Sequence, residues 1–519
     1  MNRNEAIQAI SDRTVPWDVL VIGGGATGLG AAVDAAARGY ATLLVEQHDF
    51  AKGTSSRSTK LIHGGVRYLA QGRLGLVRTA LYERELLLRN APHLVHDLKF
   101  IIPAYALWEL PFYFSGLMAY DLLAGKLSRG QAKWLSSRET HERAPTLIQH
   151  NLRGGILYHD CQFDDARLAI TLARTLFDLG GTAANYMRVA GLIKTGEKVR
   201  GVRAVDVEAG QELEIQARVV INATGVFADD VLRMDENSAR PLVTPSQGIH
   251  VVLDRSALPG DCAVVVPHTD DRRVLFAIPW HGKVLLGTTD TPVAEPELEP
   301  RPLEDELEFL LANAGRYLAA LPGRSEILSL FAGLRPLVAD RKSKSTAAAS
   351  RDHHIEVSAS GLVTIAGGKW TTYRHMGEDV VETAAQVARL PARPCSTQAL
   401  RLHGWRAGLD PHDSLTIYGS DVQGLQKLIA VDPDLGTKLH PRLPYVKAEV
   451  VWAARQEMAR TVEDVLARRT RGLFLDSRAS REAAPAVAQL LGAELAQGTG
   501  WQARQVADFT ELAAGYVPR

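Results

Sequence analysis

The sequence has few residues that could cross-link the chain or bind a metal. Three of its 519 residues are cysteines, and Cys161, Cys262 and Cys395 lie far apart. This spacing excludes a disulfide framework and a Cys-x-x-Cys metal site, and it is typical of proteins from a reducing cytoplasm. The pair His353-His354 has no cysteine or acidic partners at ligand spacing. We therefore expect no bound metal.

A net charge is also absent, because 59 Lys and Arg residues balance 59 Asp and Glu residues. Proteins that bind nucleic acid usually carry a basic excess, so we do not expect nucleic acid as a partner. Residues 1–17 contain no apolar stretch of the kind found in signal peptides. A chain of this length exceeds what one hydrophobic core usually supports, so two or three domains are expected.

No apolar run is long enough and free enough of polar residues to form a transmembrane helix. The nearest candidate is 104–124, which is rich in aromatic and aliphatic residues but is interrupted by Glu109, Pro111 and Asp121. Such a segment can lie in a membrane interface, or it can be a helix packed inside the protein. The sequence leaves both alternatives open.

What the sequence does contain, near its start, is the pattern of a dinucleotide-binding unit. An apolar strand at 18–22 runs into Gly23, Gly25 and Gly28, a helix of small residues follows, and a second strand ends on Glu46. The glycines permit a tight turn, the approach of a pyrophosphate and close packing of helix on strand. The phosphates would lie at the helix N-terminus. Because the Glu46 carboxylate suits ribose hydroxyls and repels a 2′-phosphate, NADP is disfavoured.

Two later segments favour FAD among the dinucleotides that the first motif could bind. The strand at 219–222 ends in the small residues Ala223, Thr224 and Gly225, which allow an adenylate to approach the chain. More than 300 residues after the first motif, the strand at 362–366 runs into two glycines and another helix N-terminus, which suits an anionic flavin locus. NAD would need only the first site, whereas a strand, glycines and a helix at both ends fit a longer cofactor.

The remaining pattern predicts two further structural parts. Short apolar strands separated by brief polar breaks are typical of an antiparallel sheet, and they are expected at 249–252, 263–266, 274–278 and 284–287. A helix is predicted over 303–320, and the pattern after residue 391 is helical to the end of the chain, including 448–467 and 483–495.

Motifs spread along most of the chain occur in one characteristic order. They are 18–30, Thr54-Ser55-Ser56 with Ser58 and Lys60, 61–68, 91–94, 160–161, 164–168, 222–225, 248–250, 278–280, 287–290, 333–337, and Gly367-Gly368-Lys369 with 371–374. In this order they resemble the FAD-dependent, respiratory glycerol-3-phosphate dehydrogenases. The resemblance extends from the first strand through residue 380 and continues more loosely into the helical tail.

The resemblance implies an α/β fold with a doubly wound FAD-binding domain of the glutathione-reductase-like, amino-acid-oxidase type. This domain is expected to be interleaved with an antiparallel β substrate domain, which includes a possible membrane-contacting cap, and to be followed by a C-terminal helical domain. The expected ranges are 1–90, 151–245 and 330–390 for the FAD-binding domain, 91–150 and 246–329 for the substrate domain, and 391–519 for the helical domain.

The activity that the resemblance implies is oxidation of sn-glycerol 3-phosphate to dihydroxyacetone phosphate by hydride transfer to flavin N5. Electrons would pass to a membrane quinone. The protein would then be cytoplasmic and peripheral on the inner face of the cytoplasmic membrane, with a homodimer as a further expectation.

The resemblance also assigns roles to basic residues. Arg335 and Arg351 match positions that clamp the phosphate, and a guanidinium suits this task through its bidentate geometry and permanent charge. Tyr68 is a further expected substrate contact. Arg67 and Lys369 match positions near the reacting C2 oxygen, where a cation would stabilise a developing alkoxide.

Proton transfer is assigned to His250 or His63, because imidazole titrates near working pH, and His250 is preferred. Asp165 and Arg167 are interpreted as a local ion pair at a helix start. The predicted cofactor contacts are Gly23, Gly25, Gly28, Glu46, Thr54, Ser55, Ser58, Lys60, Ala223, Thr224, Gly225, Gly368, Lys369 and Thr371.

Three alternatives remain at this point. A glycerol-3-phosphate oxidase would share the flavin site and pass electrons to oxygen. A flavin amine oxidase of the same fold would need one carboxylate clamp instead of several cationic groups, so Arg335, Arg351 and Lys369 argue against it. A non-catalytic FAD-binding module with a partner-recruiting helical tail would not need this cationic cluster.

Overall fold

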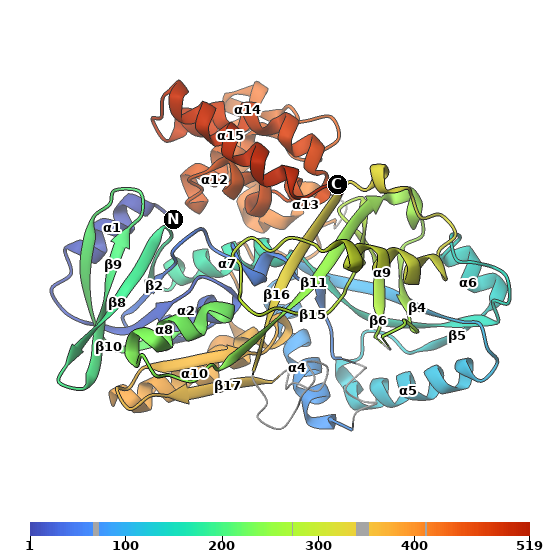
Figure 1. Cartoon of the computed structure of the whole chain (residues 1–519), viewed down its shortest axis with the longest axis horizontal. Coiled ribbons are helices and arrows are strands. Elements are labelled where there is room, and N and C mark those ends of the chain that lie inside the picture. Colours follow the sequence, from blue (N-terminus) through green and yellow to red (C-terminus); the bar gives the residue numbers. More distant parts are fainter. Residues whose placement is uncertain (66–71, 272, 339–351, 411–412, 519) are drawn as a thin grey trace.

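The computed structural model describes residues 1–65, 72–271, 273–338, 352–410 and 413–518. Figure 1 shows two β-sheets lying side by side, with the helical C-terminal part (orange to red) packed above them. The predicted α/β fold with a second β-rich part and a C-terminal helical part is confirmed.

The first sheet has eight strands, and its central order is β17-β18-β10-β1-β2-β7. These strands are β17 (His353–Val357), β18 (Val363–Gly367), β10 (Glu212–Asn222), β1 (Trp17–Ile22), β2 (Thr42–Val45) and β7 (Thr182–Ala184). From β18 to β7 the strands run parallel, whereas β17 is antiparallel to β18. An antiparallel ribbon of β8 (Met187–Thr195) and β9 (Lys198–Asp206) continues from β10.

Strand β1 is buried on both of its faces. Val19 and Val21 pack in one core with helices α2 (Ala26–Ala37), α7 (Asp165–Asp178) and α10 (Tyr373–Ala388). Leu20 and Ile22 pack in a second core with β8, β9 and α8 (Ala228–Asp235). A parallel strand covered on both faces needs a continuous apolar run rather than alternation, which explains the sequence pattern.

The second sheet has ten strands in the order β15-β11-β14-β13-β12-β4-β6-β3, with β16 paired to β11 and β5 paired to β6. They are β15 (Thr291–Pro292), β11 (Val243–Asp254), β14 (Lys283–Gly287), β13 (Leu275–Trp280), β12 (Cys262–Val266), β4 (Val95–Ala104), β6 (Gly154–Phe163), β3 (Leu61–Ile62), β16 (Ser329–Val338) and β5 (Lys133–Ser136). The sheet is antiparallel as expected, except that β12 and β4 run parallel.

Three strands of this sheet lie in ranges predicted for the FAD-binding domain. β3 falls within 1–90, β6 within 151–245 and most of β16 within 330–390. β6 pairs with β4 over its whole length, and β16 pairs with β11. The domain ranges therefore stay a prediction: a short apolar strand suits either sheet, and its partner is chosen by packing rather than by local sequence.

Helices outside the first sheet cover the second sheet and its edges. They are α4 (Leu74–Asn90), α5 (Glu109–Ala124), α6 (Ser137–Arg143) and α9 (Glu304–Gly315), the last being shorter than predicted. Helix α1 (Arg3–Ser11) instead packs against β7 of the first sheet. Among the helices in the described part of the chain, none is both long and apolar enough to cross a membrane.

The C-terminal part contains α11 (Val422–Val431), α12 (Lys447–Glu457), α13 (Gly472–Leu475), α14 (Ser477–Glu494) and α15 (Thr499–Ala514). The single helix predicted over 448–467 is wrong, because α12 ends at Glu457 and Met458 turns into the left-handed region with φ of 56°. The turn brings Glu457 to Arg167 of α7 and carries Arg469 to Asp49, at distances of 2.5 Å and 2.8 Å.

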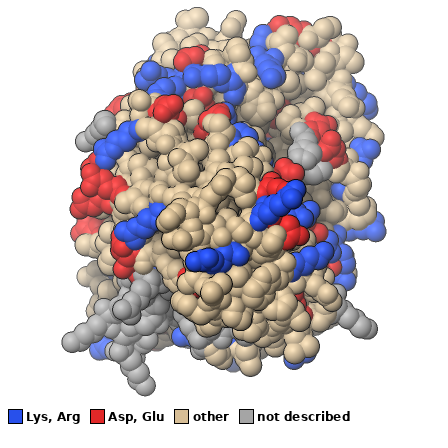
Figure 2. Space-filling model, turned by 90° about the vertical axis from the view of Figure 1, so that its right-hand side faces the viewer, with Lys and Arg blue, Asp and Glu red and all other residues tan. Residues whose placement is uncertain are grey.

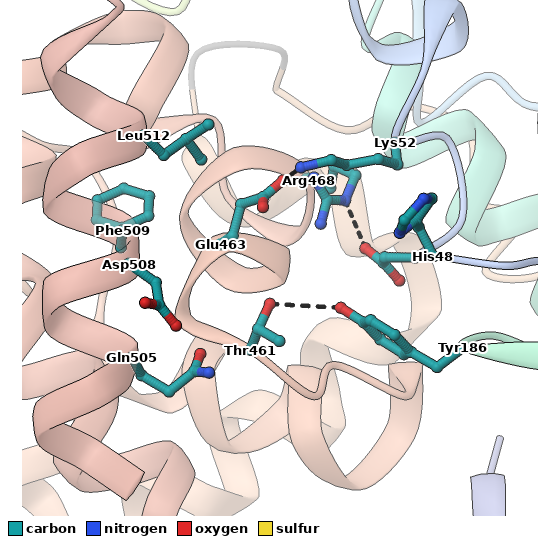
Figure 3. A pocket seen from close by; sticks show the side chains of 11 residues that line it. His48, Lys52, Tyr186, Thr461, Glu463, Arg468, Gln505, Asp508, Phe509 and Leu512 are labelled. Carbon is teal, nitrogen blue, oxygen red and sulfur yellow. Dashed lines mark hydrogen bonds and ion pairs between the residues drawn. The ribbon is translucent and has the colours of Figure 1, made fainter. Parts of the chain in front are cut away.

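A cavity of about 190 Å³ lies between the loop after β2 and the helical part (Figure 3). Charges on its walls pair across the domain boundary: Lys52 with Glu463, and Arg468 with Asp49. Figure 3 shows Tyr186 reaching Thr461 on the opposite wall. These pairs fasten the helical part to the first domain.

Helices α2 and α10 cross in unusually close contact. A Cβ atom on Gly30 would lie 2.8 Å from the carbonyl oxygen of Tyr373, and one on Gly377 would lie 2.6 Å from the carbonyl oxygen of Gly30. Side-chain carbon atoms do not approach carbonyl oxygens so closely without displacing them. Since Tyr373 is the first residue of α10 and Gly30 lies in the second turn of α2, the contact brings the two helix N-termini together.

Gly377→Ala should therefore destabilise the protein. Overpacking of this kind costs about 1–3 kcal/mol, which chemical denaturation of the purified protein would measure. Gly75→Ala on α4 is the matched control, because its Cβ would meet nothing within 4 Å, and replacing an exposed helical glycine should stabilise by about 0.5–1 kcal/mol. Equal stability of Gly377→Ala and wild type would contradict the close crossing.

Candidate active site

The turn between β1 and α2 is shaped as a cradle for an anion. Gly23 has φ of +109°, and a Cβ there would lie 2.7 Å from the carbonyl oxygen of Ala223. Gly28 packs against the same turn, where a Cβ would lie 1.9 Å from the carbonyl oxygen of Gly23. Gly25 begins α2 without any capping side chain of its own. The bare helix N-terminus therefore points backbone N–H groups at the cradle.

Glu46 is held at the rim of this cradle, directly after β2. One carboxylate oxygen accepts a hydrogen bond from the Gly24 N–H at 2.6 Å, and the other accepts from the His48 N–H at 2.9 Å. Burial raises the pKa of Glu46. Each oxygen has a second lone pair, so the fixed carboxylate can still accept bonds from ribose hydroxyls.

The end of β10 completes the first cradle with small residues. The Ala223 N–H donates to the carbonyl oxygen of Ile22 at 2.9 Å. Thr224 donates its hydroxyl to Asn222, and Gly225 has φ of +63°. A Cβ atom on Gly225 would meet nothing within 4 Å, so there is open space at this glycine.

The second cradle follows β18. Gly367 and Gly368 have φ of +81° and +78°, and a Cβ on Gly368 would lie 2.3 Å from the Met376 sulfur. Lys369 is half-buried and precedes the short helical turn Trp370–Thr372, which leads into α10. The Trp370 indole N–H donates to the carbonyl oxygen of Ser55 at 2.9 Å, which ties the two cradles together.

Ser55 and Thr54 lie on the loop that joins the cradles to the second sheet. The Ser55 hydroxyl accepts a hydrogen bond from the Ala26 N–H at 2.9 Å, at the N-terminus of α2. The Thr54 hydroxyl donates to the carbonyl oxygen of Leu334 on β16 at 2.6 Å. Ser55 thus contacts the N-terminus of α2, whereas Thr54 anchors the loop to the second sheet.

Ser58 and Lys60 are engaged with Asp165 at the start of α7. The Ser58 hydroxyl donates to Asp165 at 2.7 Å, and the fully buried Lys60 ammonium donates to the same carboxylate oxygen at 2.6 Å. Burial lowers the pKa of Lys60 to about 8 against the opposing effect of Asp165. The local pair of Asp165 with Arg167 is wrong, because Arg167 reaches Glu457 of the helical part. We infer that Ser58 and Lys60 fix the loop rather than touch the cofactor.

His250 lies on β11, in the face of the second sheet that meets this loop. Its Nε2 atom lies 3.0 Å from the Thr59 hydroxyl, and its ring stacks on Phe331 at 5.0 Å. Nδ1 is buried and has no hydrogen-bond partner within the described residues. Burial, with further contributions from Lys60 and Arg335, holds the pKa of His250 well below its usual range. The imidazole is therefore neutral, and its buried Nδ1 atom makes no hydrogen bond within the described residues.

Arg335 lies on β16, on the same face of the sheet as His250. Its register partner is Ser246, four residues before His250, and its guanidinium lies over Gly248, where a Cβ would be 2.3 Å from Nη2. The guanidinium donates to the Thr289 carbonyl oxygen at 2.8 Å and the Thr288 hydroxyl at 3.1 Å, and its side chain is 26% exposed. The guanidinium also pairs with the buried Asp290 carboxylate at 3.3 Å. Arg335 is therefore a fixed, partly exposed group that lies over Gly248, two residues before His250 on β11.

Thr371 connects the second cradle to the loop that carries His63. The His63 N–H donates to the Thr371 hydroxyl at 3.3 Å. The structure therefore gathers Gly368, Lys369, Thr371 and His63 at one end of the first sheet. The remaining predicted site residues, Arg67, Tyr68 and Arg351, lie outside the described residues.

Sequence reasoning missed Thr59 and Phe331, which orient His250, and the role of Asp165 as partner of Lys60. No local signal could have identified them, because each contact joins segments more than 80 residues apart. Within the described part of the chain, no three His, Cys, Asp or Glu side chains are grouped to hold a metal.

The residues of the two cradles fit FAD. Glycines keep the space of each cradle open, two helix N-termini can face the anionic groups of the cofactor, and the Glu46 carboxylate can accept hydrogen bonds from the ribose. Comparison with known proteins agrees. Residues 18–374 match the protein family described as FAD dependent oxidoreductase, and residues 395–506 match the C-terminal domain of alpha-glycerophosphate oxidase. FAD, the cofactor predicted from the sequence, is confirmed by the first match.

Relatives with substantial identity share one enzyme name. The mitochondrial glycerol-3-phosphate dehydrogenase of Mesocricetus auratus is 42% identical over 517 residues, covering 93% of this chain and 71% of that protein. The mitochondrial glycerol-3-phosphate dehydrogenase of Homo sapiens is 41% identical over 520 residues, with the same coverage.

Solved structures give the same result. The glycerol-3-phosphate dehydrogenase of Bacillus halodurans complexed with FAD has a TM-score of 0.81 and 30% identity, covering 99% of this chain and 98% of that chain. The L-alpha-glycerophosphate oxidase of Mycoplasma pneumoniae, at 18% identity and a TM-score of 0.56 over 75% of this chain and 98% of that chain, shares the fold. The chain therefore belongs to the FAD-dependent oxidoreductases and, within them, to the family of glycerol-3-phosphate dehydrogenases.

Proposed function

We propose that this protein oxidises sn-glycerol 3-phosphate to dihydroxyacetone phosphate, as the names of its relatives indicate. The observation that carries the proposal is the pairing of a neutral, buried histidine with an accessible arginine on one face of the second sheet. His250 supplies a base for a substrate hydroxyl, and Arg335 supplies a cation for a phosphate group.

When bound, FAD would accept the hydride that leaves C2 of the substrate. The protein must take the hydroxyl proton, and Nδ1 of His250 is the buried nitrogen without a partner among the described residues. The Thr59 hydroxyl on Nε2 and the Phe331 ring fix the orientation of the imidazole. His63 is the second candidate for this proton, and its backbone is held by Thr371.

The phosphate of the substrate would bind Arg335, assisted by Arg351 and Tyr68 as the family resemblance implies. Arg335 cannot rotate freely, because it donates to the Thr289 carbonyl oxygen and to the Thr288 hydroxyl. A guanidinium that is already oriented loses little entropy on binding an anion. Lys369 and Arg67 remain proposed stabilisers of negative charge on the C2 oxygen.

Removing the Arg335 guanidinium should discriminate between phosphorylated and unphosphorylated substrates. A charge-assisted hydrogen bond contributes about 1.5–3 kcal/mol, so Arg335→Ala should raise the KM for sn-glycerol 3-phosphate by about 10- to 100-fold while changing the turnover of glycerol little. A dye-coupled assay with both alcohols measures this. The surface variant Arg316→Ala, which loses an exposed ion pair with Asp270 and a hydrogen bond to Asn313, is the control. An equal loss on both alcohols would refute a phosphate contact.

The proposed base predicts an unusual pH profile. Because the pKa of His250 is held well below its usual range, the neutral form persists as the pH falls, and flavin reduction should stay level through about pH 6.5, where an ordinary histidine is half protonated. His250→Asn should slow flavin reduction by about 10²- to 10⁴-fold while FAD stays bound. If His250→Asn reduces its flavin at the wild-type rate, another residue takes the proton, and His63 would be tested next.

We propose a membrane quinone as electron acceptor and the inner face of the cytoplasmic membrane as location. α5 exposes Trp108, Phe112 and Leu122 at 58%, 61% and 83%, and its own charged residues are limited to Glu109 and Asp121. Figure 2 views the side of the molecule on which α5 and α6 lie in Figure 1 and shows a broad area without charged side chains. An exposed apolar helix of this kind suits a membrane interface.

Replacing Phe112 and Leu122 together by serine should release the protein from lipid vesicles while dye-coupled turnover persists. Burial of two large apolar side chains contributes about 3–6 kcal/mol, so co-sedimentation should fall by more than about tenfold. Val431→Ser on α11, which changes an 88% exposed valine on another domain, should leave binding intact. If the double variant still sediments with the vesicles as wild type does, the membrane contact lies on another part of the protein.

The second candidate is a glycerol-3-phosphate oxidase, favoured by the match of residues 395–506 to the C-terminal domain of alpha-glycerophosphate oxidase. Both enzymes would be reduced by the same substrate, so the acceptor decides between them. Reoxidation of the reduced protein by a short-chain quinone far faster than by dissolved oxygen supports the dehydrogenase, and the reverse supports the oxidase. A homodimer remains an expectation that mass measurement in solution would test.

A further inference from the structure

The inner side of α5 contacts the loop that carries His63. Tyr120 is 2% exposed, and its phenol oxygen accepts a hydrogen bond from the Gly64 N–H at 3.0 Å. The same hydroxyl donates to Asp160 Oδ2 on β6 at 3.2 Å. Asp160 is itself fixed by Arg84 of α4, at 2.8 Å. A buried chain of hydrogen bonds thus extends from the sheet through Tyr120 to the backbone next to His63.

The Gly64 backbone is in close contact with this phenol, and its N–H also interacts with Asp160. A Cβ atom on Gly64 would lie 2.2 Å from the Tyr120 hydroxyl oxygen, so the backbone passes directly over the hydroxyl group. On the other side, the Thr371 hydroxyl accepts from the His63 N–H at 3.3 Å. The two-residue segment His63-Gly64 is therefore held between one hydroxyl from the FAD-binding side and one from α5.

Packing alone does not account for a tyrosine at this position. The ring lies in a small cluster with Val77, Leu81 and Ala124, and a phenylalanine would fill the same space. Burying a hydroxyl is unfavourable unless its hydrogen bonds are made, and here it makes one as acceptor and one as donor. The group that distinguishes tyrosine from phenylalanine is the group that holds Gly64.

We propose that Tyr120 is a positioning residue for the reaction: its hydroxyl holds the His63-Gly64 segment in place against Thr371. The proposal rests on the proposed function, in which His63 is the second candidate to take the substrate hydroxyl proton. Tyr120 itself touches neither substrate nor cofactor. Misplacement of a reacting group by about 1 Å lowers rates by about 100-fold, so the loss of this bond acts on the chemical step.

The test uses the holoenzyme with Tyr120→Phe, and Tyr113→Phe as the matched control. Tyr113 lies on the same helix and loses a hydroxyl contact with His268 of 2.9 Å at the surface. Anaerobic flavin reduction by saturating sn-glycerol 3-phosphate should slow by about 10- to 100-fold in Tyr120→Phe, with KM changed by less than about threefold, and should be unaffected in Tyr113→Phe. Reduction of FAD-loaded Tyr120→Phe within twofold of wild type would overturn the proposal.

Two further measurements keep the test decisive. If Tyr120→Phe does not retain FAD, hydrogen exchange of the FAD-free Tyr120→Phe and Tyr113→Phe proteins decides: faster exchange of the peptide containing His63 and Gly64 in Tyr120→Phe supports the proposal, and equal exchange overturns it. If wild type itself is not reduced by the substrate, the proposed function fails separately. Hydrogen exchange of the peptide containing His63 and Gly64 then decides: faster exchange in Tyr120→Phe than in Tyr113→Phe supports the positioning role, and equal exchange overturns it.

Discussion

The architecture of the cofactor site depends on one close contact, the crossing of α2 and α10 at Gly30 and Gly377. Both helices follow strands of the same parallel sheet, and the glycines let the backbones approach until a Cβ atom would touch a carbonyl oxygen. The N-termini of the two helices, with their positive dipole ends, then lie next to each other. A long cofactor such as FAD could place its pyrophosphate at the first N-terminus and its flavin ring at the second.

The second constraint is the balance of buried charge around His250. Burial, and to a smaller extent Lys60, lowers the pKa of that histidine, and the Lys60 ammonium is itself paired with Asp165 at 2.6 Å. The C-terminal helical part contributes a further charge to this group, because Arg471 lies 3.3 Å from Asp165. Phe474 of the same part packs edge-on against Phe331, whose other neighbour is the His250 ring. The C-terminal helices thus contribute to the environment of the proposed base.

The sequence predicts the parts of the site that are local. Gly23, Gly25, Gly28 and Glu46 belong to one continuous strand–turn–helix unit, so spacing alone reveals them. The assignment of β6 and β16 to a sheet was beyond local reasoning, because either sheet can accept an apolar strand.

Long-range pairing also accounts for the other differences. Lys60 has the same polar surroundings in sequence as Thr54 and Ser55, and only folding brings Asp165 to it across 105 residues. The break after Glu457 has the same origin, since the ion pair with Arg167 joins positions 290 residues apart. The helical periodicity of the sequence continues past Glu457 and therefore does not predict the turn.

The most direct test of this account is a crystal structure of the full chain with FAD and sn-glycerol 3-phosphate bound. The account predicts the pyrophosphate at the N-terminus of α2, the flavin ring beside Gly368 and Thr371, and the substrate between His250 and Arg335. A flavin ring remote from the second cradle, or a substrate phosphate away from Arg335, would contradict it.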